Sequence, residues 1–113
     1  MASSIAISGA GDWTLAEEQA RHALELLDGR PDFLDEAGNA LIVLGRALME
    51  QDRFDEAHQA FAEAELNLSQ LSSASHRAVA WTAQGDLASR RGDDRTAASL
   101  YRRAAEALQD VRF

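Results

Sequence analysis

A pattern of small and aromatic residues recurs along this chain at intervals of 40 or 41 positions. In the two later copies, residues 40 positions apart correspond, and the pairs are Gly45 and Gly85, Ala57 and Ala97, Phe61 and Tyr101, and Ala64 and Ala104. An earlier partial copy, offset by 41 positions, contains Trp13, Ala16, Ala20 and Ala23. A fixed internal period of this length is typical of stacked repeats, in which each unit packs against its neighbours. Such arrays commonly serve as binding surfaces.

The spacing of apolar residues predicts five helices and no strand after residue 12. The expected helices span residues 14–28, 32–51, 55–71, 76–91 and 94–110. Thr14 and Glu17 have the spacing of a capping box at the start of the first helix. Pro31 follows the end of that helix, and Asp55 is the expected N-cap of the third. The predicted fold class is therefore all-α.

Length and composition indicate one helical domain at residues 12–113, with a flexible leader at residues 1–11. The 113 residues are 46% hydrophobic, which is enough to form a core. Cysteine is absent, which excludes disulfides and thiol nucleophiles. No apolar run approaches the roughly 20 residues that a membrane span needs. Since the first residues also lack the basic region of a signal peptide, we expect a cytoplasmic protein that does not bind membranes.

The charge is acidic overall and unevenly distributed. A net charge of -8 argues against direct binding of nucleic acid. Residues 1–73 carry 14 acids and 4 arginines, a net of -10, whereas residues 74–113 carry 5 acids and 7 arginines, a net of +2. Arginine without lysine, together with much alanine, is typical of a GC-rich genome and favours a bacterial source. The second half contains one basic cluster, which is either a solvated face or a patch for an acidic partner such as another copy: Arg90, Arg91, Arg95, Arg102 and Arg103.

The two later repeats resemble the tetratricopeptide repeat (TPR), an antiparallel pair of helices A and B. The residues that match helix A are Leu41, Leu44, Gly45 and Leu48 in one repeat, and Trp81, Gln84, Gly85 and Ala88 in the next. Those that match helix B are Ala57, Phe61 and Ala64, and then Ala97, Tyr101 and Ala104. The resemblance covers about residues 12–108. It implies an α-solenoid of about five antiparallel helices, with one half repeat followed by two full repeats.

Two features depart from the family pattern. The period is 40–41 residues rather than 34, and Ser69 stands where a proline is expected after helix B. Long-period repeats of this kind look like those of bacterial transcriptional and signalling regulators. An alanine-rich five-helix bundle is the alternative fold.

In the family that the chain resembles, ligands usually occupy a concave groove lined by helix A. The matching positions here are Asn39, Ile42, Arg46, Met49, Glu50, Val79, Thr82, Asp86, Ser89 and Arg90. The lysine–asparagine clamp that binds chaperone C-termini is not matched. The resemblance thus implies a non-enzymatic module that binds a peptide or protein segment, as part of a bacterial regulator.

Two other functions stay open. The first is self-association, forming a homodimer through an open end of the array. Tyr101 and Leu108 are expected to face inward, and Leu108, Val111 and Phe113 are the candidate contacts between copies. The second is a sensor of a peptide or small molecule.

No residue pattern indicates catalysis, a metal or a cofactor. His22, His58 and His76 are scattered, without the spacing of metal ligands. Adjacent acids such as Glu17 and Glu18 are expected in first helical turns, where they favour the helix dipole. No serine lies in a nucleophile-elbow motif. We therefore expect that the chain is not an enzyme.

Overall fold

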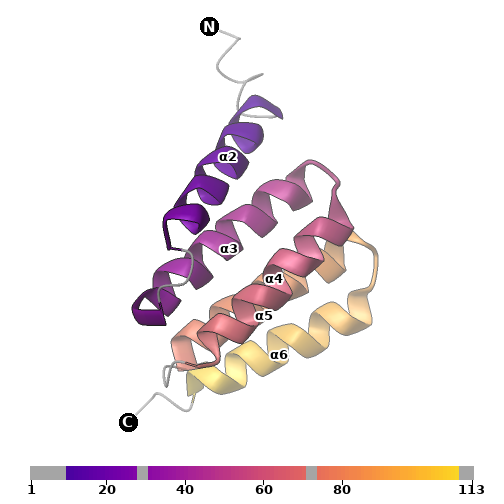
Figure 1. Cartoon of the computed structure of the whole chain (residues 1–113). Helices are drawn as coiled ribbons and strands as arrows, with labels where there is room; N and C mark the ends of the chain where they lie inside the picture. The colour runs from indigo at the N-terminus through magenta and orange to yellow at the C-terminus, as the bar shows by residue number, and fades with distance from the viewer. Residues whose placement is uncertain (1–9, 28–30, 71–73, 110–113) are drawn as a thin grey trace, which may run out of the picture.

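The computed structural model describes residues 10–27, 31–70 and 74–109, which form five α-helices and one short 3-10 helix (Figure 1). The elements are α2 (Ala10–Leu27), η1 (Pro31–Phe33), α3 (Leu34–Glu50), α4 (Phe54–Leu68), α5 (Ala74–Arg90) and α6 (Asp94–Gln109). These ranges contain no strand, which confirms the predicted all-α fold. Residues 1–9 of the expected leader lie outside the described residues, and its last two residues belong to α2.

The N-terminal caps predicted for two of the helices are wrong. Because α2 begins at Ala10, Thr14 lies inside the helix, and Glu17 binds side chains of the α3–α4 turn rather than the helix start. The helix α4 begins at Phe54 with Arg53 at the N-cap, since the Arg53 carbonyl already accepts a hydrogen bond from the Ala57 amide at 3.0 Å. Asp55 is consequently in the first turn, where its charge still favours the helix dipole.

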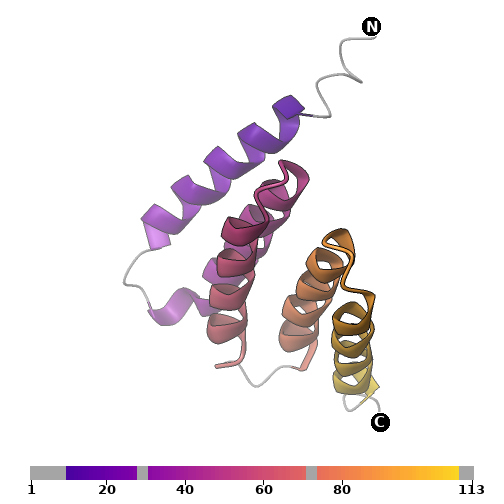
Figure 2. The same ribbon diagram turned by 90° about the vertical axis from the view of Figure 1, so that its right-hand side faces the viewer.

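The helices are stacked in chain order. Each helix packs against its neighbour in the sequence, and α3 also contacts α5, so the first helices of two successive pairs lie side by side. Figure 2 shows α2 and α6 at opposite ends of the stack. The stack measures 48 × 36 × 27 Å. Packing of each repeat against the next one in chain order agrees with the order that the internal period predicts.

Glycine allows the two helices of each pair to approach closely. A Cβ atom added to Gly45 would lie 2.3 Å from Cε1 of Phe61, and one added to Gly85 would lie 2.8 Å from Cε1 of Tyr101. Phe61 is fully buried because its helix α4 lies between α3 and α5, whereas Tyr101 on the last helix is 39% exposed. The expectation that Leu108 faces inward is wrong, since this side chain is 48% exposed.

The same turn joins the helices of both pairs. Asp52 and Gly92, which are 40 residues apart, both have left-handed backbones, with φ of 61° and 83°. In the first turn, the Arg53 amide donates a hydrogen bond to the carbonyl of Leu48, five positions earlier, at 2.9 Å. In the second turn, the Asp93 amide donates in the same way to the carbonyl of Ala88 at 2.8 Å. This is the hydrogen-bond pattern of a Schellman C-cap.

Replacing Gly92 with alanine should lower the free energy of unfolding by about 1 kcal/mol, because a side chain disfavours the left-handed backbone. No atom lies within 4 Å of the added Cβ, so the loss comes from conformation alone. The reverse change, Asp52→Gly, should raise stability or leave it unchanged. Urea denaturation followed by circular dichroism measures both, and a stabilised Gly92→Ala variant would contradict the shared turn geometry.

Candidate functional site

Two ion pairs connect α3 to α5. The Arg46 guanidinium contacts the Asp86 carboxylate at 2.9 Å, and the Arg90 guanidinium contacts the Glu50 carboxylate at 2.5 Å. Both pairs join positions exactly one 40-residue period apart. The repeat therefore places equivalent residues of α3 and α5 opposite one another, with complementary charges.

An open hollow of about 310 Å³ lies beside these ion pairs. It is lined by Arg46, Met49, Glu50, Asp86, Ser89, Arg90 and Tyr101. Six of these seven are among the ten groove positions that the resemblance implies. The structure brings those six together at one end of α3 and α5.

Tyr101 is the lining residue that the sequence analysis did not include in the groove. Its hydroxyl donates a hydrogen bond to Oδ1 of Asp86 at 2.5 Å. That hydrogen bond, together with burial and the Asp86 charge, raises the pKa of Tyr101 above its ordinary value of 10.0. Asp86 thus accepts from both Tyr101 and Arg46, and its carboxylate is fixed in place.

The other four predicted groove residues do not line the hollow. Ile42 is buried in the core, Thr82 is half-buried, and Asn39 and Val79 are exposed. Val43, one turn before Arg46 on α3, is a further exposed apolar residue that the sequence analysis did not single out. Its repeat equivalent Ala83 is fully buried, so the period alone gave no sign that Val43 would face solvent.

The hollow carries two positive and two negative side chains and is therefore neutral in sum. The side chains of Arg46, Asp86, Glu50 and Arg90 are between 27% and 44% exposed, so each ion pair remains accessible from solvent. Partly exposed pairs of this kind contribute little net stability. Their polar atoms can therefore bind charged groups of a ligand at small cost to the fold.

A second hollow, of about 550 Å³, lies where α4, α5 and α6 meet. Its lining combines apolar side chains with polar ones at the turn: His58, Gln84, Leu87, Ala88, Arg91, Asp93, Thr96 and Leu100. This hollow could not be predicted from the sequence, because its lining residues come from three helices and the α5–α6 turn and share no motif.

The residues predicted for self-association are only partly within the described chain. Leu108 is exposed on α6, and Val111 and Phe113 lie outside the described residues. The exposed residues three, seven and ten positions before Leu108, on the same face of α6, are Ala105, Tyr101 and Ala98. Two arginines of the basic cluster are bound internally, since Arg90 pairs with Glu50 and Arg91 contacts Asp55 at 3.2 Å.

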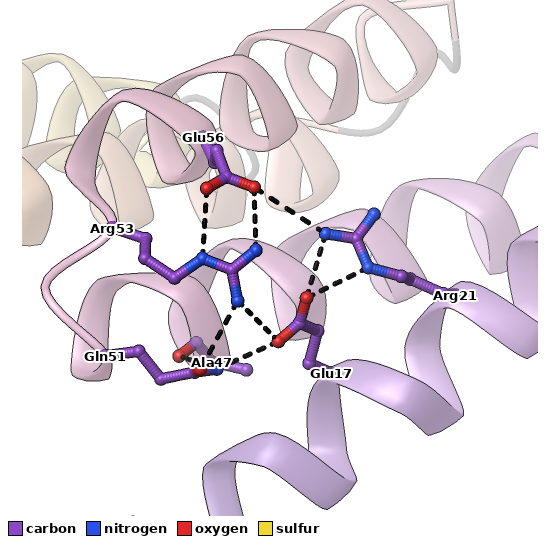
Figure 3. Close-up of polar contacts among 6 residues, drawn as sticks. All are labelled: Glu17, Arg21, Ala47, Gln51, Arg53 and Glu56. Carbon is purple, nitrogen blue, oxygen red and sulfur yellow. Dashed lines mark hydrogen bonds and ion pairs between the residues drawn. The ribbon is translucent and has the colours of Figure 1, made fainter.

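A polar network attaches α2 to the turn between α3 and α4 (Figure 3). Glu17 is 9% exposed and accepts hydrogen bonds from Arg21 at 3.0 Å, Gln51 at 3.1 Å and Arg53 at 2.8 Å. Arg53 also forms two hydrogen bonds to Glu56, at 3.0 and 2.8 Å. This geometry indicates a structural role for the network, because every member is bound by another.

Stability should fall as the pH drops through the acid range, because of Glu17 and Glu56. Burial raises the pKa of Glu17, but hydrogen bonds from Gln51 and Arg21 and the charge of Arg53 outweigh it, so the pKa lies below its ordinary 4.5. The hydrogen bonds from Arg53 likewise lower the pKa of Glu56. In acid, the folded state therefore binds fewer protons than the unfolded state. The two glutamates add stability above pH 4.5, and this contribution is lost as the pH falls through their lower pKa values in the folded state.

Urea midpoints measured between neutral pH and pH 3 test this dependence. Glu17→Gln should flatten the decline, whereas Glu18→Gln, a change at an exposed neighbour, should leave it as in the wild type. If the urea midpoint falls equally steeply with pH in the two variants, the Glu17 network does not contribute to the loss of stability in acid.

Comparisons with known proteins find no match for this chain among family models, curated proteins or solved structures. None of the described helices is long and apolar enough to cross a membrane. Within the described ranges, no three histidine or acidic side chains are grouped in a way that would hold a metal ion.

Proposed function

We propose that this chain is a non-enzymatic TPR-like module that binds a peptide or protein segment in the hollow between α3 and α5, as part of a cytoplasmic bacterial regulator. The observation that carries the proposal is the pairing of Arg46 with Asp86 and of Glu50 with Arg90. These pairs lie across two repeat-related helices that pack against each other, so their side chains form one preformed surface. A preformed surface binds with less ordering cost than a flexible one.

The lining favours a ligand of a particular kind. The two arginines offer donors to carboxylates, and Asp86 and Glu50 offer acceptors to amines or amides. Tyr101, which is partly exposed, adds an aromatic contact at the same place, above the buried Met49. The ligand that fits best is a short segment with both an acidic and a basic side chain next to an apolar anchor.

Exchanging the charges of one ion pair tests the site without removing the pair. In the double variant Arg46→Glu, Asp86→Arg, the same two positions can still form an ion pair with the charges exchanged. The free energy of unfolding should therefore stay within about 1 kcal/mol of the wild type. Partner capture from a cell lysate should nevertheless fall at least about tenfold, which corresponds to about 1.4 kcal/mol of binding free energy. The matched control is the exchange Arg91→Asp, Asp55→Arg, which alters a pair outside this hollow, at the edge of the second one, and should retain the partner.

A partner that binds the exchanged variant as tightly as the wild type would overturn the proposed site. Loss of the partner in both exchanged variants would also contradict it, because the effect would then not be specific to the hollow.

The second hollow supports a different function, the sensing of a small molecule. Its volume of about 550 Å³ is within the range of ligand pockets, and Leu87 and Leu100 provide apolar contact. A compound that raises the melting temperature of the wild type, but not of Leu100→Trp, would favour this function. The self-association alternative rests on exposed Leu108, and it predicts that polar changes at Leu108, Val111 and Phe113 dissolve oligomers.

A further inference from the structure

The second hollow lies at the repeat equivalent of the polar network that attaches α2 to the α3–α4 turn (Figure 3). Equivalent positions are 40 residues apart between α3 and α5 and between α4 and α6, and 41 residues apart between α2 and α4. By this correspondence, five of the six residues drawn in Figure 3 have an equivalent in the lining of the second hollow. The pairs are Glu17 and His58, Ala47 and Leu87, Gln51 and Arg91, Arg53 and Asp93, and Glu56 and Thr96.

Shorter side chains open the junction of α4, α5 and α6, compared with the junction of α2, α3 and α4. Ala62 stands at the position equivalent to Arg21, and Thr96 stands at that of Glu56. The corresponding hollow at the first junction measures only about 140 Å³, whereas the second hollow measures about 550 Å³. The two hollows share four equivalent lining positions, which are Leu44 and Gln84, Leu48 and Ala88, Glu56 and Thr96, and Ala60 and Leu100.

The lining of the second hollow is polar at one end and apolar further along the helices. His58, Arg91 and Thr96 lie near the start of α4, the end of α5 and the start of α6, and these helix ends are on the same side of the stack (Figure 1). The buried Leu87 and the half-buried Leu100 are each about one turn further along α5 and α6. A ligand with one polar head group and an apolar body fits this distribution.

The group that the first junction has and the second lacks is a carboxylate. At the first junction the Glu17 carboxylate accepts hydrogen bonds from Gln51 and from two arginines. The equivalent of Gln51 is Arg91, which again offers donors, but the equivalent of Glu17 is His58, which brings no carboxylate. Within the described ranges, no hydrogen bond or ion pair involves His58. A donor position is therefore kept at the second junction without the acid that it would bind.

Arg91 is available to a ligand. Its guanidinium contacts the Asp55 carboxylate at 3.2 Å, but the side chains of Arg91 and Asp55 are 43% and 94% exposed, and exposed pairs of this kind contribute little. The guanidinium also lies over the Phe54 ring, 5.8 Å from its centroid. Asp93, the acidic residue of the lining, accepts a hydrogen bond from the Thr96 amide at 3.2 Å and so caps the start of α6.

We propose that the second hollow binds a small carboxylic acid with an apolar body, and that its carboxylate takes the place that Glu17 fills at the first junction. The carboxylate accepts hydrogen bonds from the Arg91 guanidinium, whose planar fork matches it, and from a ring N–H of His58. The apolar body lies against Leu87 and Leu100. This inference rests on the small-molecule function of the second hollow and is independent of the peptide site, because the two hollows share no lining residue.

Isothermal titration calorimetry with octanoate tests the ligand class. Octanoate should bind the wild type at least about tenfold more tightly than octan-1-ol or octylammonium, which have the same chain length without a carboxylate. Arg91→Gln should remove this preference, whereas the Arg46→Glu, Asp86→Arg variant of the first hollow should keep it. Equal affinities for the three probes, a preference for octylammonium, or no binding of octanoate would overturn the proposal. Binding of octan-1-ol or octylammonium that Leu100→Trp abolishes would still leave the hollow as a small-molecule site.

The repeat itself provides a second test. His58→Glu places a carboxylate where Glu17 stands in the first junction, so the new side chain can pair with Arg91 and should lower the affinity for octanoate at least about tenfold. His22→Glu is the matched control, because it makes the same change at an exposed residue of α2, and it should bind octanoate as the wild type does. Residue 58 is also exposed, so both variants should show the circular dichroism of the wild type. Undiminished octanoate binding by His58→Glu would mean that the carboxylate does not take the Glu17 place, contrary to the proposal.

Discussion

Replacing Phe61 with alanine should lower the free energy of unfolding by about 3–5 kcal/mol, the typical loss for a buried aromatic residue. Phe61 has no exposed surface, and its ring lies against Gly45 on α3. Its backbone carbonyl accepts a hydrogen bond from Gln84 of α5 at 3.4 Å. The residue therefore lies where the two repeats meet, and the change leaves a cavity between them. Urea denaturation followed by circular dichroism measures the loss.

Tyr101→Ala is the matched control, because Tyr101 holds the same repeat position on α6 but is 39% exposed. Its loss of stability should be clearly smaller than that of Phe61→Ala. A domain of this size is stable by only about 5–15 kcal/mol, so the Phe61 variant should be partly unfolded at elevated temperature while the Tyr101 variant stays folded. Equal losses would contradict the packing of α4 between α3 and α5.

Replacing Gly45 with alanine should also destabilise the fold, although alanine favours a helix more than glycine does. The new methyl group would lie 2.3 Å from Cε1 and 2.5 Å from Cδ1 of the Phe61 ring. Overpacking of this kind costs about 1–3 kcal/mol and opposes a gain of about 1 kcal/mol in helix propensity. Because the ring is fully buried, it cannot move outward into solvent to relieve this contact. We expect a net loss in the urea experiment.

The equivalent change Gly85→Ala should be nearly neutral. The Tyr101 ring meets the added methyl at 2.8 Å, but it is partly exposed and can shift. A smaller residue at position 61 should relieve the overpacking in Gly45→Ala. The double variant Gly45→Ala, Phe61→Leu should therefore lose less free energy of unfolding than the sum of the losses of the two single variants. A stabilised Gly45→Ala variant, or strictly additive losses, would contradict the close approach of α3 and α4.

The helical fold could be predicted because several local signals agree. The apolar spacing identified all five helices, and the paired positions Gly45 and Gly85 identified where each helix pair approaches closely. Helix starts were harder to predict. Thr14 and Glu17 have the spacing of a capping box, but the helix begins earlier, and tertiary hydrogen bonds from Gln51 and Arg53 bind the Glu17 side chain instead.

The candidate site could be predicted only in part. The repeat period placed Arg46 opposite Asp86, and opposite charges at equivalent positions were a usable signal for an ion pair. Exposure could not be predicted in the same way. Phe61 and Tyr101 hold equivalent positions. In the described part of the chain α5 covers Phe61 and no helix follows α6, so Tyr101 reaches into the hollow.

The most direct test of the proposed function is an NMR titration of the ¹⁵N-labelled chain with the segment that it captures from lysate. The largest amide shifts should fall on residues 46–50 of α3 and 86–90 of α5, with Tyr101 on α6. These shifts should disappear in the Arg46→Glu, Asp86→Arg variant. Shifts confined to the second hollow around His58 and Leu100 would show that the ligand binds elsewhere and would contradict the proposed site.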